Sequence, residues 1–319
     1  DFSFLGLQLT LQYTLPILIG VVASGFNYNE ENLKLLLAWF LKLSGLIYLF
    51  FLASKLFGSG FTPNLAAMPM IFSVAISLFM GLFFLTRRWI FLLYTVILFL
   101  APIIEVTRMG IAAISVILIF HFANQSIKSK LIFAGLGLLA FIIVFSSESF
   151  QSKTFYSGTG KITDITLDYY ENPDLRSSGR ISWKKLLEPG LEKEPLWGNG
   201  PRADNAYLTK ITKMRGGEAH NDYLSVRFNY GSIGLILLMF GFVGTFMSLY
   251  IECRKFANNF LIWLLATSAL TLFIPFMMFM YTDNILKYTV FFPNYFFAII
   301  GIVYSLKRDE DLGCNTALQ

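Results

Sequence analysis

The chain has 319 residues, of which 55% are hydrophobic, 17% aromatic and 14% charged, and its mean hydropathy is +0.61. Soluble domains carry about 25% charged residues, so this composition excludes a soluble globular protein with a polar surface. The net charge of +5, the 34 phenylalanines and the 15 tyrosines fit lipid-facing helices with basic cytoplasmic flanks better than a nucleic-acid-binding surface. We therefore predict an all-α integral membrane protein with no nucleic-acid partner.

Apolar runs of bilayer length predict a polytopic helical bundle of about nine spans. Lys34 and Lys42 fall inside the second run, and we expect them to snorkel to the interface or to face the bundle. The runs lie at about 3–24, 33–57, 67–86, 89–104, 108–124, 130–146, 229–251, 260–281 and 289–306.

Basic clusters at alternate connections predict the orientation, because Lys and Arg collect on the cytoplasmic side. These clusters are Arg87-Arg88, Lys128 with Lys130, Arg254-Lys255 and Lys307-Arg308. The chain then divides into N-terminal transmembrane helices at 1–146, one large extracytoplasmic (periplasmic) loop at 147–221, C-terminal transmembrane helices at 222–306 and a cytoplasmic tail at 307–319. Asp1 lies outside in this scheme, so we expect an odd number of helices before it. Cys253 and Cys314 lie inside, where no disulfide is expected.

Arg108 is an unusual cation, because it opens the fifth span on the outer side, where short loops are poor in positive charge. Ionisable residues of membrane segments are functional candidates, so Arg108 is a candidate binding residue. The alternative is an ion pair with Glu105, three residues earlier. His121, near the inner end of the same span, is interpreted as an interfacial side chain without chemistry.

The outer loop is predicted to contain a short helix that begins near Arg180 and is ended by Pro189-Gly190. Arg180, Trp183 and Leu187 share one face of this helix, which we expect to press on the membrane or the bundle. Arg180 is therefore a second candidate, and a snorkelling interfacial arginine is the alternative. The solvated face carries Lys184, Lys185 and Glu188.

Two further features of the loop are predicted to be structural. Trp197-Gly198-Asn199-Gly200-Pro201 reads as a tight turn, since a lone Gly-x-Gly is a weak signal for phosphate binding. Asp164, Asp168 and Asp174 do not have the spacing of a packed ligand set, and a solvated acidic face accounts for them. We expect the protein to use no metal ion and no cofactor.

His220 ends the polar loop shortly before an apolar run, so it lies at the water–membrane boundary. An imidazole there is a candidate for proton chemistry near neutral pH; the alternative is a loop histidine that only forms a hydrogen bond. Asn221 or Asp222 is expected to cap the next helix, whose positive end favours a neutral imidazole able to act as a base. Asp222 could instead orient the imidazole or be the base itself. Accessory candidates on the same helical face are Tyr223 and Arg227.

These elements together resemble the O-antigen ligase and polymerase family. The specific element is His220-Asn221, followed after nine residues by Gly231 and Gly234 in a Gly-x-x-Gly pattern. The resemblance covers about residues 65–306, and family members have more spans than are counted here. The other elements are Thr107-Arg108-Met109-Gly110, Ser178-Gly179-Arg180 before Trp183, and Pro195-Leu196-Trp197-Gly198-Asn199-Gly200.

The resemblance implies a glycosyltransferase of the bacterial cytoplasmic (inner) membrane with an outward-facing active site. It would move a glycan from undecaprenyl diphosphate to a hydroxyl of a glycan, a lipid A core or a protein, as a polymerase or as a ligase. The residues offer a suitable chemistry. Arg108 and Arg180 can neutralise the leaving diphosphate, and His220 can act as general base on the acceptor hydroxyl. Attack opposite the leaving group would invert the anomeric centre.

A transporter and a structural scaffold are the two alternatives to an enzyme. A transporter or flippase for a lipid-linked sugar or a small anion would carry polar groups near the bilayer midplane, where the chain has few charges apart from Lys34 and Lys42. A purely structural scaffold would leave the placement of Arg108, Arg180 and His220 unexplained. The enzyme is therefore the favoured class.

Overall fold

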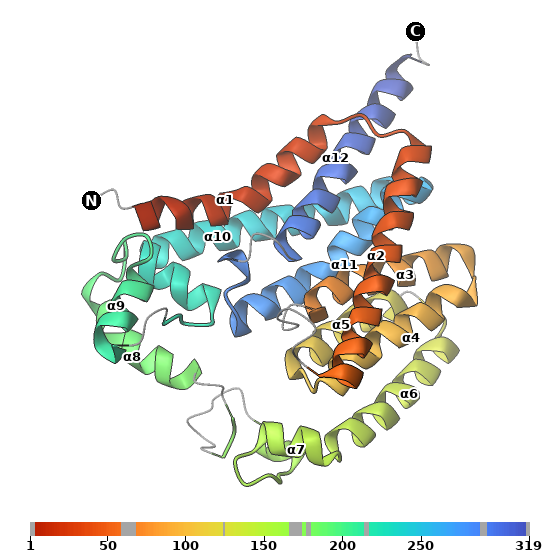
Figure 1. The fold of residues 1–319 in the computed structure, drawn as a ribbon. Helices are drawn as coiled ribbons and strands as arrows, with labels where there is room; N and C mark the ends of the chain where they lie inside the picture. The colour runs from red at the N-terminus through yellow and green to blue at the C-terminus, as the bar shows by residue number, and fades with distance from the viewer. Residues whose placement is uncertain are drawn as a thin grey trace. The chain divides into compact units, whose positions relative to one another are not determined.

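The computed structural model describes residues 4–58, 68–123, 125–165, 174–176, 180–213, 217–287 and 292–316. Within these ranges the chain forms twelve α-helices, two short 3-10 helices and one isolated antiparallel bridge, between Phe155 and Leu175. The all-α prediction is confirmed. The helices are α1 (Phe4–Gly25), α2 (Glu30–Phe57), α3 (Met68–Thr86), α4 (Trp89–Ile104), α5 (Arg108–Ala123), α6 (Ile127–Phe145), α7 (Glu148–Thr154), α8 (Arg180–Lys193), α9 (Ala203–Thr212), α10 (Asp222–Lys255), α11 (Phe260–Thr282) and α12 (Phe292–Thr316) (Figure 1).

The long apolar helices make the chain a polytopic helical membrane protein. Six helices of the described part are long and apolar enough to cross a bilayer: they contain the stretches Gly6–Gly25, Glu30–Phe57, Pro69–Thr86, Ile127–Phe145, Asp222–Lys255 and Phe260–Thr282. The predicted number of about nine also counts α12 and two shorter apolar helices, α4 and α5, as spans.

The chain folds as two compact units. Unit 1 consists of Asp1–Leu7, Phe122–Leu238 and Met280–Asn284, and unit 2 of Gln8–His121, Met239–Phe279 and Ile285–Gln319. The helix α10 therefore begins in unit 1 and ends in unit 2.

The core of unit 2 is built around α3 and α11, which bury 72% and 67% of their apolar windows. The helix α3 packs against α2, α4 and α12 (Figure 1). Aromatic rings fill the centre, where the Phe276 and Phe296 centroids lie 4.9 Å apart. Two ion pairs join residues at the ends of these helices. Lys55 at the end of α2 pairs with Glu105 after α4, and Lys307 of α12 pairs with Glu252 of α10.

The surroundings of Lys34, Lys42 and His121 in unit 2 can be compared with those predicted from the sequence. Lys34 pairs with Glu30 on the exposed surface of α2, and Lys42 is exposed with its amine 5.0 Å from the centroid of the Trp39 ring, so both lysines face outward. His121 was predicted to be interfacial, and this is wrong: its side chain is buried and stacks on Phe84. A Cβ atom at Gly81 of α3 would meet the Leu264 side chain at 2.6 Å but the imidazole of His121 only at 3.9 Å, an ordinary contact.

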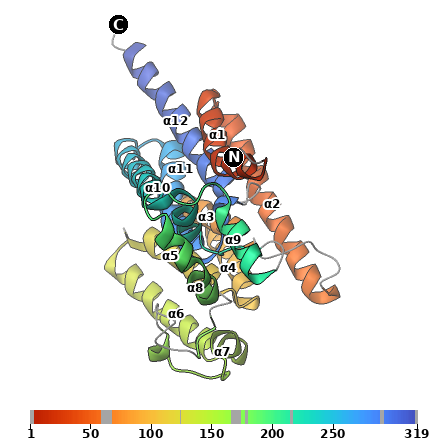
Figure 2. The same ribbon diagram turned by 90° about the vertical axis from the view of Figure 1, so that its left-hand side faces the viewer.

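The helices α8 and α9 of unit 1 fold onto the first half of α10. Leu187 and Leu191 of α8 and Leu208 of α9 form a buried cluster with Ala219 and Phe228. Figures 1 and 2 both show α8 and α9 lying side by side, and α7 beside the end of α6. This cluster gives unit 1 a hydrophobic core of its own, formed by α8, α9 and the first half of α10.

The predicted stop of α8 at Pro189-Gly190 is wrong, because the helix continues to Lys193. Leu187 and Leu191 stand one turn apart, and both are buried in the cluster. Gly190 lies against the Phe228 ring, which a Cβ atom there would meet at 2.4 Å. Packing on both sides of the proline thus outweighs the hydrogen bond that Pro189 cannot donate.

The helix α10 is interrupted at Gly231, whose φ of 69° and ψ of −173° are not helical. In a regular helix, Ser232 and Ile233 would donate their N–H groups to the carbonyls of Phe228 and Asn229. Here they donate to the turn instead, at 2.9 Å to Pro195 O and 3.3 Å to Leu196 O. The two carbonyls left over are used by the same turn. Phe228 O accepts from the Asn199 N–H and Asn229 O from the Gly200 N–H, both at 2.9 Å.

This exchange of backbone hydrogen bonds explains the glycines of both motifs. A Cβ atom at Gly231 would meet Leu196 O at 2.0 Å, and one at Gly198 would meet Gly231 N at 2.4 Å. Both glycines also have positive φ, which L side chains rarely adopt. The prediction that residues 197–201 form a structural turn is confirmed, and the turn's partner is the break in α10.

We expect Gly231→Ala to destabilise the protein by at least about 3 kcal/mol, because the backbone conformation is one that glycine alone adopts readily and the new methyl group would overlap a carbonyl. Denaturant unfolding of the purified protein in detergent measures the loss. Gly241→Ala is the matched control on the same helix, since a Cβ atom there meets nothing within 4 Å. Equal stability of the two variants would contradict the packing described here.

Candidate functional site

His220 occupies a fixed position immediately before α10. Its φ of 47° is left-handed, which is uncommon for a residue other than glycine. Asn221 follows as the helix cap, and its Oδ1 accepts the Leu224 N–H at 3.0 Å. The predicted cap is therefore confirmed for Asn221. The His220 side chain is 47% exposed.

The partner of the imidazole is Asp283, which follows the end of α11. His220 Nδ1 lies 3.3 Å from Asp283 Oδ1, and the Asp283 side chain is 30% exposed. A carboxylate at this distance favours the tautomer in which Nδ1 carries the proton, so that the basic lone pair is on Nε2. This is the arrangement of an oriented general base.

A buried amide fastens the His220 segment to the Asp283 segment. Asn284 is fully buried; its Oδ1 accepts the Asn221 N–H at 3.2 Å and its Nδ2 donates to Glu218 at 2.9 Å. The Asn284 N–H also donates to Asp283 Oδ1 at 2.9 Å, which holds that carboxylate. Glu218 and Asn221 flank His220, so both sides of the histidine are anchored to one asparagine.

A second buried network fixes the first half of α10 to α9. Asp204 is fully buried, and its carboxylate accepts hydrogen bonds from Ser225 Oγ and from Asn229 Nδ2. The Asp204 N–H donates to Asn229 Oδ1 at 3.0 Å. Ser225 and Asn229 stand one helical turn apart, so a single carboxylate sets the rotation of the helix that begins after His220.

The accessory candidates differ in their surroundings. Asp222 is fully buried and Tyr223 is half-buried, whereas Arg227 is exposed. Because α10 begins at Asp222, His220 precedes the helix and does not share its face with Tyr223 and Arg227. The carboxylate that contacts the imidazole is that of Asp283, whereas Asp222 was the orienting residue considered from the sequence.

The two candidate arginines lie in different units. Arg108 is the half-buried first residue of α5 in unit 2. It follows a tight turn in which Val106 has a φ of 51° and the Thr107 N–H donates to Pro102 O at 2.9 Å. Gly110 in the same motif packs against Pro102, which a Cβ atom there would meet at 3.1 Å. The motif thus serves a close helix connection at the point where Arg108 begins α5.

Arg180 begins α8 in unit 1, and its side chain lies outside the described part. Trp183 and Leu187, on the face that the sequence assigns to it, do pack in the buried cluster. Lys184, Lys185 and Glu188 are exposed, as predicted. The helix face is therefore confirmed, and the meeting of Arg108, Arg180 and His220 in one cavity stays a prediction.

Sequence reasoning missed Asp283 and Asn284. A signal was present, because this polar pair directly follows the predicted span at about 260–281. What could not be inferred is which of the outer polar residues contacts the imidazole, since 63 residues separate His220 from Asp283.

Asp164 and Asp174 have structural hydrogen-bond partners. Asp164 accepts the Lys161 N–H at 2.7 Å. Asp174 accepts hydrogen bonds from the Ser157 N–H and Oγ–H, and these bonds lower the pKa of its carboxyl group. Asp168 lies outside the described residues. Across the described ranges, no three His, Cys, Asp or Glu side chains are grouped so that they could hold a metal ion; metal independence stays a prediction.

Comparison with known proteins bears on the same part of the chain. Residues 93–239 match the family model described as O-Antigen ligase. The matched stretch contains Arg108, Arg180, the turn at 195–200, His220 and Gly231. No curated protein matches the chain.

We expect Asn284→Ala to loosen the His220 segment, because the partly buried Asn221 N–H and Glu218 would each lose a hydrogen-bond partner, at a cost of about 1–3 kcal/mol. Hydrogen exchange should show faster exchange of the Asn221 amide, while amides in the middle of α11 keep their protection. Asn258→Ala, at an exposed site, is the control and should change neither. Unchanged exchange at Asn221 in the Asn284→Ala protein would contradict the anchoring role.

Proposed function

We propose that this chain is a multi-pass membrane glycosyltransferase of the O-antigen ligase type that uses lipid-linked glycans. It moves a glycan from undecaprenyl diphosphate to an acceptor hydroxyl in surface polysaccharide assembly. The observation that carries the proposal is the half-exposed imidazole of His220 beside the Asp283 carboxylate. The acceptor is a glycan, a lipid A core or a protein, and the active site faces outward from the cytoplasmic membrane.

His220 is the general base of the proposed reaction. Its Nε2 takes the proton of the acceptor hydroxyl while the hydroxyl oxygen bonds to the anomeric carbon. Asp283 stabilises the imidazolium that forms and keeps the ring in position, so Asp283 is a positioning residue. The anchoring of Glu218 and Asn221 by Asn284 limits the motion of the histidine backbone, which supports a defined geometry for proton transfer.

Arg108 and Arg180 are the proposed diphosphate ligands. Charge grows on the leaving diphosphate as the glycosidic bond breaks, and a guanidinium group can give two charge-assisted hydrogen bonds to phosphate oxygens. The hydroxyl attacks from the face opposite the diphosphate, so the anomeric configuration is inverted. Support for Arg180 comes from the helix face that it shares with the packed residues Trp183 and Leu187; support for Arg108 comes from its place in the matched family domain.

The interruption of α10 does not favour transport as the function. Transporters use the ends of broken helices to bind ions or substrates. In this chain the turn at 195–200 donates hydrogen bonds to the carbonyls of Phe228 and Asn229 at the break. It accepts hydrogen bonds from the N–H groups of Ser232 and Ile233. Those backbone groups are thus engaged by protein.

We expect His220→Ala to lower the rate of glycan transfer by about 10²–10⁴-fold, because the hydroxyl loses its base. Purified protein is incubated with an undecaprenyl-diphosphate oligosaccharide and each acceptor class in turn; a ladder of products indicates a polymerase and one shifted band a ligase. Asp283→Asn should give an intermediate loss and an altered pH profile of the rate.

The control for these two variants is Lys210→Gln, at an exposed position of α9, which should transfer glycan at the original rate. Retained folding and donor binding in His220→Ala distinguish a lost base from a lost structure. Full transfer activity of His220→Ala would remove the proposed base.

We expect Arg108→Lys and Arg180→Lys each to reduce kcat/KM for the lipid-linked donor by roughly 10- to 100-fold. The lysine ammonium group cannot form the bidentate hydrogen bonds that a guanidinium group makes with phosphate. Kinetics at varied donor concentration measure the change. Lys185→Arg, on the exposed face of α8, is the matched control and should leave kcat/KM unchanged. Wild-type kinetics in both arginine variants would exclude them as diphosphate ligands.

A further inference from the structure

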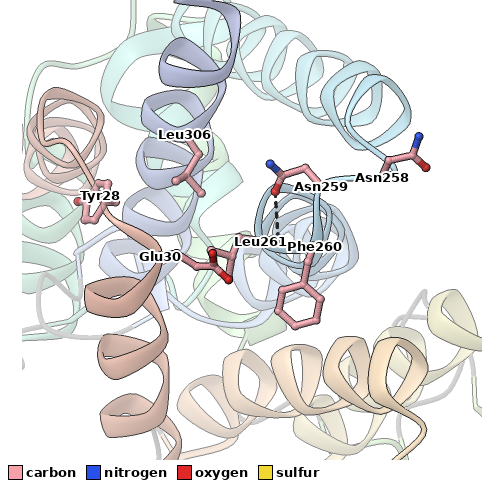
Figure 3. Close-up of a pocket in the computed structure, with 7 residues that line it drawn as sticks. All are labelled: Tyr28, Glu30, Asn258, Asn259, Phe260, Leu261 and Leu306. Atoms are coloured by element: carbon pink, nitrogen blue, oxygen red, sulfur yellow. Dashed lines mark hydrogen bonds between the residues drawn. The ribbon is translucent and has the colours of Figure 1, made fainter. Parts of the chain in front are cut away.

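Unit 2 contains a cavity of about 510 Å³ that the proposed reaction does not use (Figure 3). It lies between the start of α2, the start of α11 and Leu306 of α12. In Figure 3 the Glu30 carboxylate points into the space between α2 and α11. The volume falls within the range of small-molecule sites, about 300–1,000 Å³.

The cavity is at a membrane boundary. The apolar helix α1 ends at Gly25 and α2 begins at Glu30, and α11 begins at Phe260. The residues that connect these helices include the polar side chains of Asn27, Asn29, Asn258 and Asn259. A ligand in this cavity would therefore lie at the level of lipid headgroups.

An apolar groove of about 330 Å³ on α1 adjoins the cavity. Leu15, Leu18 and Val22 line the groove and are 40%, 51% and 59% exposed. Tyr28 lines both the groove and the cavity. A hydrocarbon surface thus leads along the helix to a polar pocket, which is the shape of a site for one lipid chain and its headgroup.

The charges select the type of headgroup. Glu30 is the charged residue of the cavity lining, and Tyr28 also lines the cavity. Burial raises the pKa of Tyr28, so its O–H stays protonated and can donate to a phosphate oxygen. The nearby cations are engaged: Arg308 donates to Asn27 Oδ1 at 2.8 Å, and Lys307 pairs with Glu252. A cavity lined by one carboxylate and one tyrosine hydroxyl suits a headgroup with an ammonium and a phosphate group.

We propose that this cavity and groove bind one phospholipid with a primary ammonium headgroup, of the phosphatidylethanolamine class. The ammonium group binds the Glu30 carboxylate, the phosphate accepts from Tyr28, and an acyl chain lies along Leu15, Leu18 and Val22. Glu30 now pairs with Lys34 within α2, and both side chains are more than half exposed, at 65% and 57%. The lipid ammonium therefore competes with a lysine that can swing into water.

The proposal is tested by native mass spectrometry of the full chain purified in detergent, with dioleoyl phosphatidylethanolamine or dioleoyl phosphatidylglycerol added. The original protein should retain phosphatidylethanolamine in preference. Glu30→Gln should lower this retention about tenfold, the effect of losing one charge-assisted contact. Lys34→Gln should raise the retention, because it removes the competing cation.

Glu31→Gln is the matched control, since Glu31 is the adjacent exposed carboxylate of the same helical turn and does not line the cavity. It should retain lipid like the original protein. Preference for phosphatidylglycerol, equal losses in Glu30→Gln and Glu31→Gln, or lower retention in Lys34→Gln would each overturn the proposal. The measurement involves no glycan transfer, so its outcome is independent of the proposed enzymatic function.

Discussion

The structure of unit 1 depends on the exchange of backbone hydrogen bonds between the turn at 195–200 and the break in α10. A helix that breaks inside an apolar segment leaves N–H and C=O groups that water cannot reach, and each would cost several kcal/mol unsatisfied. The turn supplies two donors and two acceptors at the required spacing. Two glycines allow the close approach, because a Cβ atom at Gly198 or Gly231 would overlap the opposite backbone.

This exchange of hydrogen bonds fixes α8 and α9 relative to the start of α10. The turn connects α8 to α9, so its position on α10 brings Leu187, Leu208 and Phe228 into one cluster. The Asp204 network then sets the rotation of the first half of α10. His220 directly precedes this half-helix, and its left-handed backbone is held on both sides through Asn284. A rigid support beneath the histidine is what an oriented general base needs.

The predictions that depend on residues close together in the sequence were right. The apolar runs, the cap at Asn221 and the packed face of α8 depend on residues within one or two helical turns, and the structure confirms them. The predicted stop at Pro189 and the interfacial placement of His121 were wrong, because both depend on distant neighbours. Phe228 and the cluster around it favour a longer α8, and Phe84 stacks on the buried imidazole of His121.

The sequence by itself determined that the chain is a helical membrane protein, where its apolar helices run and which histidine and arginines merit attention, since hydrophobicity and charge are written in every residue. It also carried the family pattern around His220 and Gly231. Only the tertiary structure decided that Asp283 contacts His220, that Asn284 anchors its backbone and that the two glycine motifs interlock. These contacts join segments about 30 to 60 residues apart in the chain. The entropy of loop closure changes little with length over this range, so sequence separation does not identify which segments come into contact.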